Sequence, residues 1–100
     1  MPAPPFRTLI TPEFGRVLAA IKRTDLAKHK KVLKAVRLLR EHGPAHLGSQ
    51  THQYESLHGP DGQTVWESYV ENKTPGAWRL WWWHGPDTEA ITLLTVGPHP

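Results

Sequence analysis

The residues of this sequence best suited to chemistry lie in one aromatic stretch, residues 78–84, which reads WRLWWWH. A run so rich in aromatic residues, bounded by turn residues, predicts a β-strand, whose side chains alternate between two faces. One face should carry the apolar side chains of a core: Trp78, Leu80 and Trp82. The other face should combine a cation with indole rings: Arg79, Trp81 and Trp83.

We expect this strand to be central in its sheet and to present Arg79 to a ligand on a partly open face. An arginine suits an anionic ligand, because its planar guanidinium binds phosphate oxygens in pairs and keeps its charge. The alternative is structural: Arg79 could form a cross-strand pair with Glu67 or Glu71, which would contribute only about 0.2–1 kcal/mol. On the residues alone, we favour the ion pair.

The elements that must position these residues begin with a short strand and two helices. Phe6–Ile10 is predicted to be a strand, and Thr11-Pro12 to begin a helix. The apolar side chains of this helix recur at helical spacing: Phe14, Val17, Leu18 and Ile21. A second helix, from Leu26 to about His42, has its own apolar side: Leu26, Val32, Leu33, Val36 and Leu39. Because Gly43 ends this helix and the two helices are joined closely, we expect an antiparallel helical hairpin.

The second half of the chain is predicted to be β-structure. A short strand is expected at Gln53–Leu57, followed by a turn at residues 58–62. Three stronger strand patterns follow: Thr64–Asn72, Ala77–His84 and Ala90–Val96. Short loops with Pro and Gly separate them, so they should form an antiparallel meander with the middle strand central. The predicted fold class is α+β, an N-terminal strand and an α-helical hairpin packed on a small antiparallel sheet, in a single domain of residues 1–100.

The alternation in residues 65–71 also predicts a register between two of these strands. Glu67, Tyr69 and Glu71 should share the open face with Arg79, since carboxylates on the core side would be costly. A simple four-residue loop between Asn72 and Ala77 would give the opposite parity. We therefore expect an odd loop length or a β-bulge in this hairpin.

Most of the positive charge lies on the predicted helices. Nine of the twelve Lys and Arg residues fall between Arg16 and Arg40, where Asp25 is the only acid. Such a block is usually a solvated helix face, yet it also attracts polyanions such as nucleic acid. The lack of cysteine excludes disulfides and zinc–thiolate sites, and no apolar run has membrane-spanning length. The histidines lack the helical spacing of zinc ligands, so we expect no metal, no other cofactor and a cytoplasmic protein.

Several short motifs, taken in order, resemble the RelE/ParE superfamily of toxins from bacterial type II toxin–antitoxin systems. They are Leu57-His58-Gly59, the segments Trp66–Val70 and Trp78–Trp82, and the segment Ile91–His99. With the helical hairpin, the likeness covers nearly the whole chain. The resemblance implies a small mRNA endonuclease that acts on the ribosome, or, in the ParE branch, a non-enzymatic gyrase inhibitor. It also implies a cognate antitoxin, which is DNA-binding in such systems, and an inactive relic that only binds this antitoxin is a third alternative.

The resemblance also assigns roles to individual residues. Arg79 matches the arginine that RelE-type nucleases place against the scissile phosphate, and His99 matches the C-terminal position of a catalytic histidine or basic residue. Glu67 lies in the strand where other members supply lysine, arginine or glutamate. The lysines of that strand are absent here, and Pro100 follows His99 where a tyrosine is usual. The acid–base set is therefore either incomplete or of a histidine–glutamate kind.

RNA cleavage without a metal needs a base for the 2′-hydroxyl, a cation for the phosphate and an acid for the leaving 5′-oxygen. Arg79 suits the second role, His99 suits either proton-transfer role, and Glu67 could be the base. Without the resemblance, His99 would be interpreted as a frayed tail residue. Side chains expected to contact RNA are Lys30, Lys31, Lys34 and Arg37 through phosphates, and Trp81 and Tyr54 by stacking on bases.

Overall fold

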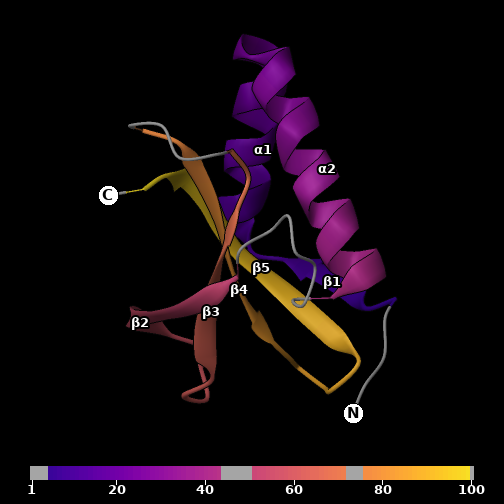
Figure 1. The fold of residues 1–100 in the computed structure, drawn as a ribbon, viewed down its shortest axis with the longest axis vertical. Coiled ribbons are helices and arrows are strands. Elements are labelled where there is room, and N and C mark those ends of the chain that lie inside the picture. Colours follow the sequence, from indigo (N-terminus) through magenta and orange to yellow (C-terminus); the bar gives the residue numbers. More distant parts are fainter. Residues whose placement is uncertain (1–4, 44–50, 72–75, 100) are drawn as a thin grey trace.

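The computed structural model describes residues 5–43, 51–71 and 76–99, which form two helices and a five-stranded sheet (Figure 1). The elements, in chain order, are β1 (Arg7–Ile10), α1 (Pro12–Thr24), α2 (Leu26–His42), β2 (His52–His58), β3 (Thr64–Tyr69), β4 (Trp78–His84) and β5 (Ala90–Pro98). The two helices lie side by side against one face of the sheet. The predicted α+β class and the helical hairpin are therefore confirmed.

The strand order is β1-β5-β4-β3-β2, which makes β4 the central strand. The pairs β3–β4 and β4–β5 are antiparallel, as predicted for this meander. The sheet is mixed rather than wholly antiparallel, because β1 pairs in parallel with β5. Parallel neighbours need a long connection between them, and here the intervening chain includes the helical hairpin and the rest of the sheet.

The register between β3 and β4 agrees with the alternation pattern. Trp66 pairs with Trp82, and Tyr69 pairs with Arg79, so an odd number of residues separates the paired positions. This pairing places Glu67 and Tyr69 on the same face as Arg79. The prediction for Glu71 is wrong: β3 ends at Tyr69, and the Glu71 carboxylate contacts Lys28 and Lys31 of α2 on the helix side. The predicted strand end at Asn72 and the turn residues 73–75 lie outside the described residues.

A β-bulge in β5 lets both faces of the sheet be filled. Trp81 pairs with Thr95 but Trp82 pairs with Leu93, so Leu94 is an extra residue on its strand. As a result, Leu93 faces the helices while Leu94 packs against the opposite side of the sheet.

Local signals in the sequence explain where the helices begin and end. The Thr11 hydroxyl accepts a hydrogen bond from the Phe14 N–H at 3.1 Å, and Asp25 caps α2 through the Lys28 N–H at 3.0 Å. Gly43 ends α2 with a φ of 76°, a conformation that glycine adopts without strain.

Two residues of the predicted apolar side of α2 are exposed, so that part of the prediction is wrong. Leu26 is 55% exposed and Leu33 is 45% exposed, whereas Val32 and Leu39 are buried. Each residue advances the helix by about 100°, so Leu33 lies about 100° and Leu26 about 120° from Val32 in the same direction around the helix, and both point away from the core.

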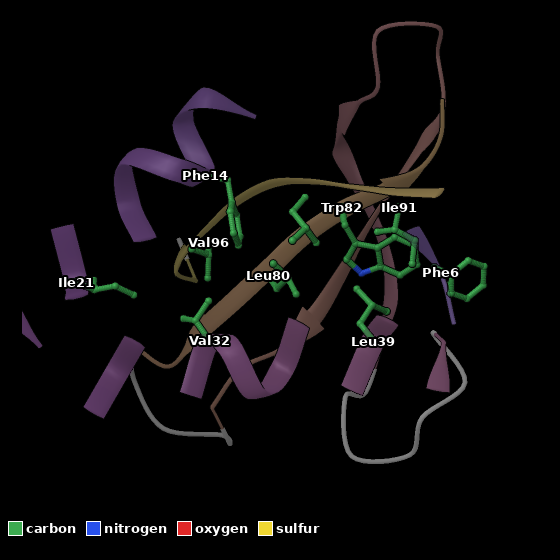
Figure 2. Close-up of a cluster of buried hydrophobic side chains, with 10 residues drawn as sticks. Phe6, Phe14, Ile21, Val32, Leu39, Leu80, Trp82, Ile91 and Val96 are labelled. Atoms are coloured by element: carbon green, nitrogen blue, oxygen red, sulfur yellow. The ribbon is translucent and has the colours of Figure 1, made fainter. Parts of the chain in front are cut away.

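The main core lies between the helices and the sheet (Figure 2). It contains Phe6, Phe14, Ile21, Val32, Leu39, Leu80, Trp82, Ile91, Leu93 and Val96. Trp82 is fully buried at its centre, and its indole N–H donates a hydrogen bond to the Ser68 hydroxyl at 2.9 Å. Trp78 packs at the edge of this cluster, so the predicted core face of β4 is confirmed.

The opposite face of β4 is less open than predicted. Trp81 is 5% exposed and Trp83 is 8% exposed, and both belong to a second apolar cluster with Val65. Tyr54 from β2 and Leu94 from the bulge of β5 pack against these rings. The expectation of an exposed Trp81 is therefore wrong, because a sheet edge and a bulge cover this face without any helix.

Candidate functional site

Arg79 lies on the sheet face that points away from the helices. Its paired residues are Tyr69 on β3 and Gly97 on β5, and its guanidinium carbon is 3.7 Å from the centroid of the Tyr69 ring. This stacking leaves only 8% of Arg79 exposed. The predicted face is correct, but the predicted exposure of Arg79 is wrong.

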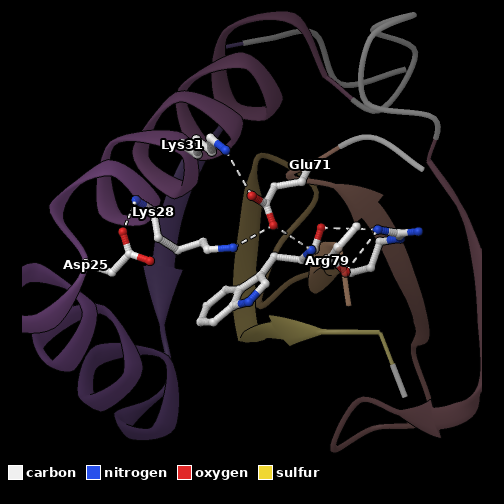
Figure 3. Close-up of polar contacts among 7 residues, drawn as sticks. Asp25, Lys28, Lys31, Glu71 and Arg79 are labelled. Carbon is white, nitrogen blue, oxygen red and sulfur yellow. Dashed lines mark hydrogen bonds and ion pairs between the residues drawn. The ribbon is translucent and has the colours of Figure 1, made fainter. Parts of the chain in front are cut away.

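The hydrogen bonds of Arg79 hold one side of its guanidinium and leave the other available. Nη1 donates to the carbonyl oxygens of Ala77 at 3.2 Å and Trp78 at 3.4 Å (Figure 3). Nε is enclosed and has no hydrogen-bond partner, and Nη2 makes no hydrogen bond within the described parts of the chain. A ligand oxygen could therefore bind the Nη2 side of the group.

The cross-strand ion pair that was the structural alternative for Arg79 is not formed. The Glu71 carboxylate contacts Lys28 Nζ at 2.6 Å and Lys31 Nζ at 3.0 Å instead. Among the residues that the structure describes, no carboxylate lies within ion-pair distance of Arg79. The guanidinium is thus buried and positioned, yet no carboxylate of the described residues neutralises its charge.

Room for a small side chain is present beside Arg79, at Gly97 on β5. A Cβ added at Gly97, the partner of Arg79 on β5, would meet no heavy atom within 4 Å. Glycine in a strand often marks a place where another molecule approaches the backbone closely. The pairing puts this open position on the same face as the guanidinium.

Glu67 is buried beneath two histidines on the same face of the sheet. Its side chain is 1% exposed, with Oε1 2.7 Å from His52 Nε2 and Oε2 3.5 Å from His99 Nε2. His52 is the paired residue of Glu67 on β2, whereas His99 follows the end of β5. The two rings therefore reach one carboxylate from strands on opposite sides of it.

His99 is held on the sheet rather than frayed. Its backbone N–H donates to the Ala77 carbonyl oxygen at 3.1 Å, and Arg79 Nη1 donates to the same oxygen. This shared acceptor places the backbone of His99 next to the guanidinium of Arg79. The three residues predicted to be catalytic thus lie on one face of β3, β4 and the end of β5.

Enclosed polar atoms without partners concentrate at this place. Within the described residues, four such side-chain atoms occur: Glu67 Oε2, Arg79 Nε, Trp81 Nε1 and His84 Nδ1. The first three belong to adjacent positions on the face that carries Arg79. Buried polar groups are nearly always paired in folded proteins, so a cluster of unpaired ones indicates a functional site. His84 lies on the helix side of the sheet, where burial lowers its pKa.

An ion-pair cluster on the helix side fixes the strand segment that precedes Arg79. Glu71 accepts hydrogen bonds from Lys28, Lys31 and the Trp78 N–H, the last at 3.1 Å (Figure 3). These bonds, led by that from Lys28, lower the pKa of Glu71 from 4.5 to about 2. Lys28 Nζ also lies 4.9 Å from the Trp78 ring centroid. The carboxylate therefore connects α2 to the backbone of β4 one residue before Arg79.

The residues predicted to contact RNA are only partly brought together. Tyr54 and Trp81 pack edge to face with ring centroids 5.8 Å apart; Trp81 is buried by this contact, and Tyr54 is only partly exposed. The basic residues Lys30, Lys31, Lys34 and Arg37 are exposed on α2, in the helix layer on the other side of the sheet from Arg79. A single strand of RNA could contact both sets only by passing around an edge of the sheet.

The sequence did not predict His52 or Tyr69 as residues of this site. His52 was considered only among the histidines that lack the spacing of zinc ligands, and Tyr69 only in the register of residues 65–71. His52 pairs with Glu67 across the strands, and Tyr69 pairs with Arg79. Both could have been predicted only if the strand pairing had been known. Within the described residues, no group of three or more His, Asp or Glu side chains is arranged to hold a metal ion.

The sequence has no match among protein-family models or among curated proteins. Solved structures, by contrast, share its fold. A YoeB dimer from Staphylococcus aureus aligns with a TM-score of 0.70 at 10% identity, over 96% of this chain and 99% of that chain. A YoeB/ParE toxin from Agrobacterium tumefaciens also has a TM-score of 0.70, at 16% identity over 94% and 99% of the two chains.

An archaeal RelE–RelB complex from Pyrococcus horikoshii shows the same fold. Its TM-score is 0.67 at 13% identity, over 94% of this chain and 94% of that chain. These structures are toxins of toxin–antitoxin systems, and the alignments span nearly the full length of both partners. The chain therefore has the fold of the RelE/ParE toxins, as its short motifs predicted.

Proposed function

We propose that this protein is the toxin of a toxin–antitoxin system and that it cleaves mRNA on the ribosome without a metal ion. The single observation that carries the proposal is Arg79. It is a buried guanidinium with, among the described residues, no partner for Nη2 and no neutralising carboxylate, and a Cβ at the neighbouring Gly97 would meet no atom within 4 Å. A buried cation of this kind fits an anionic ligand such as a phosphate.

In this proposal Arg79 binds the scissile phosphate and stabilises the charge that builds on it during cleavage. The guanidinium is held by Tyr69 and two carbonyl oxygens, so it need not reorganise when the reaction begins. His99 lies next to Arg79, and its side chain is 46% exposed. Its ring can therefore reach a ribose hydroxyl or the leaving oxygen. His99 therefore serves in proton transfer.

Glu67 has a different role from that of a base in direct contact with RNA. Its carboxylate is 1% exposed and lies beneath the two histidine rings, so a substrate hydroxyl does not reach it. A carboxylate at hydrogen-bond distance from an imidazole nitrogen orients the ring. We therefore propose Glu67 as a positioning residue.

Partners follow from the same proposal. The solved RelE and YoeB structures include complexes with RelB and YefM, and we propose that this chain likewise binds a cognate antitoxin. The ribosome and mRNA are the proposed targets, with the basic side chains of α2 as contacts to ribosomal RNA. No helix within the described residues is long and apolar enough to cross a membrane. We propose that the protein acts in the cytoplasm, where ribosomes are found.

The test combines growth arrest on induction with primer extension on cellular mRNA. Single-turnover cleavage of mRNA on purified bacterial ribosomes should fall about 10²–10³-fold in Arg79→Ala, as expected for loss of one electrostatic stabiliser. Arg7→Ala is the matched control, because Arg7 is exposed and its ion pair among the described residues is with Asp87, away from Arg79. Equal cleavage by folded Arg79→Ala and the parent would show that the proposed site is wrong.

The likeness to the YoeB/ParE toxin of Agrobacterium tumefaciens supports gyrase inhibition as a second candidate. In that case the parent would arrest growth and inhibit DNA supercoiling by gyrase while cleaving no RNA. A protein that binds an antitoxin but does not arrest growth on induction would be an inactive relic.

A further inference from the structure

We infer that His52 is a second proton-transfer residue of this site, and that Glu67 holds His52 and His99 as an acid–base pair. This inference rests on the proposed RNA cleavage and adds a residue to it. The observation is the placement of two histidine rings, from β2 and from beyond β5, beside one buried carboxylate. His52 Nε2 lies 2.7 Å from Glu67 Oε1, and His99 Nε2 lies 3.5 Å from Oε2, an ion-pair distance without a hydrogen bond.

The burial of Glu67 creates the need for another group. Cleavage requires both a base and an acid, and His99 can supply only one of these at a time. Glu67 is 1% exposed, with each of its oxygens facing an imidazole, so it does not meet the substrate. Arginine keeps its charge, so Arg79 can act neither as the acid nor as the base. A residue at the surface of the site must therefore take the remaining role.

His52 satisfies the requirements of position and access. Its side chain is 52% exposed, close to the 46% of His99, and its Nε2 lies 2.7 Å from Glu67 Oε1. Its ring is also 6.3 Å, centroid to centroid, from Tyr69, the residue on which Arg79 stacks. His52 thus lies near the proposed phosphate site because its ring contacts Tyr69. His99 lies near the same site because it shares the Ala77 carbonyl oxygen with Arg79.

The charges around the two rings suit an acid–base pair. The charged or titratable side chains described on this face include Glu67, Arg79, Tyr69, Tyr54, His52 and His99. A buried carboxylate needs a positive partner, and one negative charge neutralises one imidazolium. The proposed reaction needs one protonated ring and one neutral ring at its start.

The reaction is balanced without any added reactant. The neutral imidazole takes the proton of the 2′-hydroxyl, and the 2′-oxygen attacks the phosphorus. The bond from phosphorus to the 5′-oxygen breaks, and that oxygen receives the proton of the imidazolium. The products are a 2′,3′-cyclic phosphate and a 5′-hydroxyl, and the two rings have exchanged protonation states.

The decisive variant is His52→Gln, because a glutamine amide can still donate a hydrogen bond to Glu67 but cannot transfer a proton. Single-turnover cleavage of mRNA on purified bacterial ribosomes would be measured between about pH 5 and pH 9, where a base and an acid give a bell-shaped profile. His99→Gln is measured in parallel. His58→Gln is the matched control, since His58 is exposed at the other end of β2.

The expected result is a loss of about 10²–10⁴-fold in His52→Gln and in His99→Gln, each with one limb of the pH profile missing and the two missing limbs on opposite sides. His58→Gln should behave as the parent. Unfolding by denaturant would establish that all variants are folded. A His52→Gln protein with the parent's rate, or with both limbs intact, would overturn the inference and leave the proposed cleavage standing. A parent that cleaves no RNA would overturn both.

Discussion

The ion-pair cluster of Glu71 should be a main source of stability at neutral pH, and Glu71→Gln tests this. The carboxylate receives hydrogen bonds from two lysines and a backbone N–H and is 18% exposed. Glutamine has nearly the same shape and keeps one acceptor oxygen, so the substitution removes the charge with little change in packing. It also leaves Lys28, whose side chain is 18% exposed, without a carboxylate.

The magnitude follows from the pKa of Glu71, which is lowered from 4.5 to about 2. Such a difference corresponds to about 3 kcal/mol of stability at neutral pH, because each tenfold change in proton affinity is worth about 1.4 kcal/mol. The side chain of Lys31 is 56% exposed, so water screens its contribution. We expect Glu71→Gln to lower the free energy of unfolding by about 2 kcal/mol at pH 7, within the range found when a buried hydrogen-bonded charge is removed.

The direction of the pH dependence is fixed by the sign of the shift. The folded-state pKa of Glu71 lies below its unfolded value, so the stabilisation is complete above pH 4.5 and is lost as the pH falls toward about 2. The difference in stability between the parent and Glu71→Gln should therefore be largest at neutral pH and shrink in acid. Other carboxylates titrate alike in both proteins and cancel in this difference.

The assay is denaturant unfolding of both proteins over a pH series, with Glu41→Gln as the control. Glu41 is 46% exposed and its only described ion pair, with Arg40, is 4.0 Å long, so its removal should change stability by less than about 0.5 kcal/mol. A Glu71→Gln difference that stays constant from neutral pH to strong acid would refute an electrostatic origin. So would a difference at pH 7 no larger than that of Glu41→Gln.

Two further predictions concern the site and the basic helix. Gly97→Ala should leave the free energy of unfolding unchanged, because the added Cβ meets nothing within 4 Å. Gly97→Val should slow RNA cleavage, because the larger side chain fills the space beside Arg79. Cleavage at the parent's rate by a folded Gly97→Val protein would mean that the ligand lies elsewhere. Lys30→Glu combined with Lys34→Glu should weaken binding to ribosomes and reduce its dependence on salt, because phosphate contacts release counterions. Ribosome binding that is unchanged at low and high salt would leave these lysines as solvated charge.

Much of the fold could be predicted because its local signals agree with one another. The alternation in residues 78–84 predicted a central strand with one core face, and the core contains Leu80 and Trp82 as expected. The limits of α2 followed from a capping aspartate and a terminal glycine. The parallel pairing of β1 had no such signal, because it joins residues about eighty positions apart in the chain.

The site was harder to predict, since it depends on which strands become neighbours. The sequence singled out Arg79, Glu67 and His99, but the contact between His52 and Glu67 exists only because β2 pairs with β3 in one register. The burial of Arg79 and Trp81 likewise depends on long-range partners, Tyr69 and Tyr54. Alternation gives the face of a side chain, whereas exposure also depends on what lies over that face.

The burial of Arg79 strengthens, rather than weakens, the case for an anion site. An exposed guanidinium is solvated and its attraction for a phosphate is screened, but the same charge among rings acts in a medium of lower effective dielectric constant. Trp81 and Trp83 form such surroundings on the face that holds Arg79. The Tyr69 ring and the Ala77 and Trp78 carbonyl oxygens compensate part of the cost of burying the charge, and no described carboxylate compensates the rest. A bound phosphate would supply the missing negative charge, so ligand binding should itself stabilise the fold.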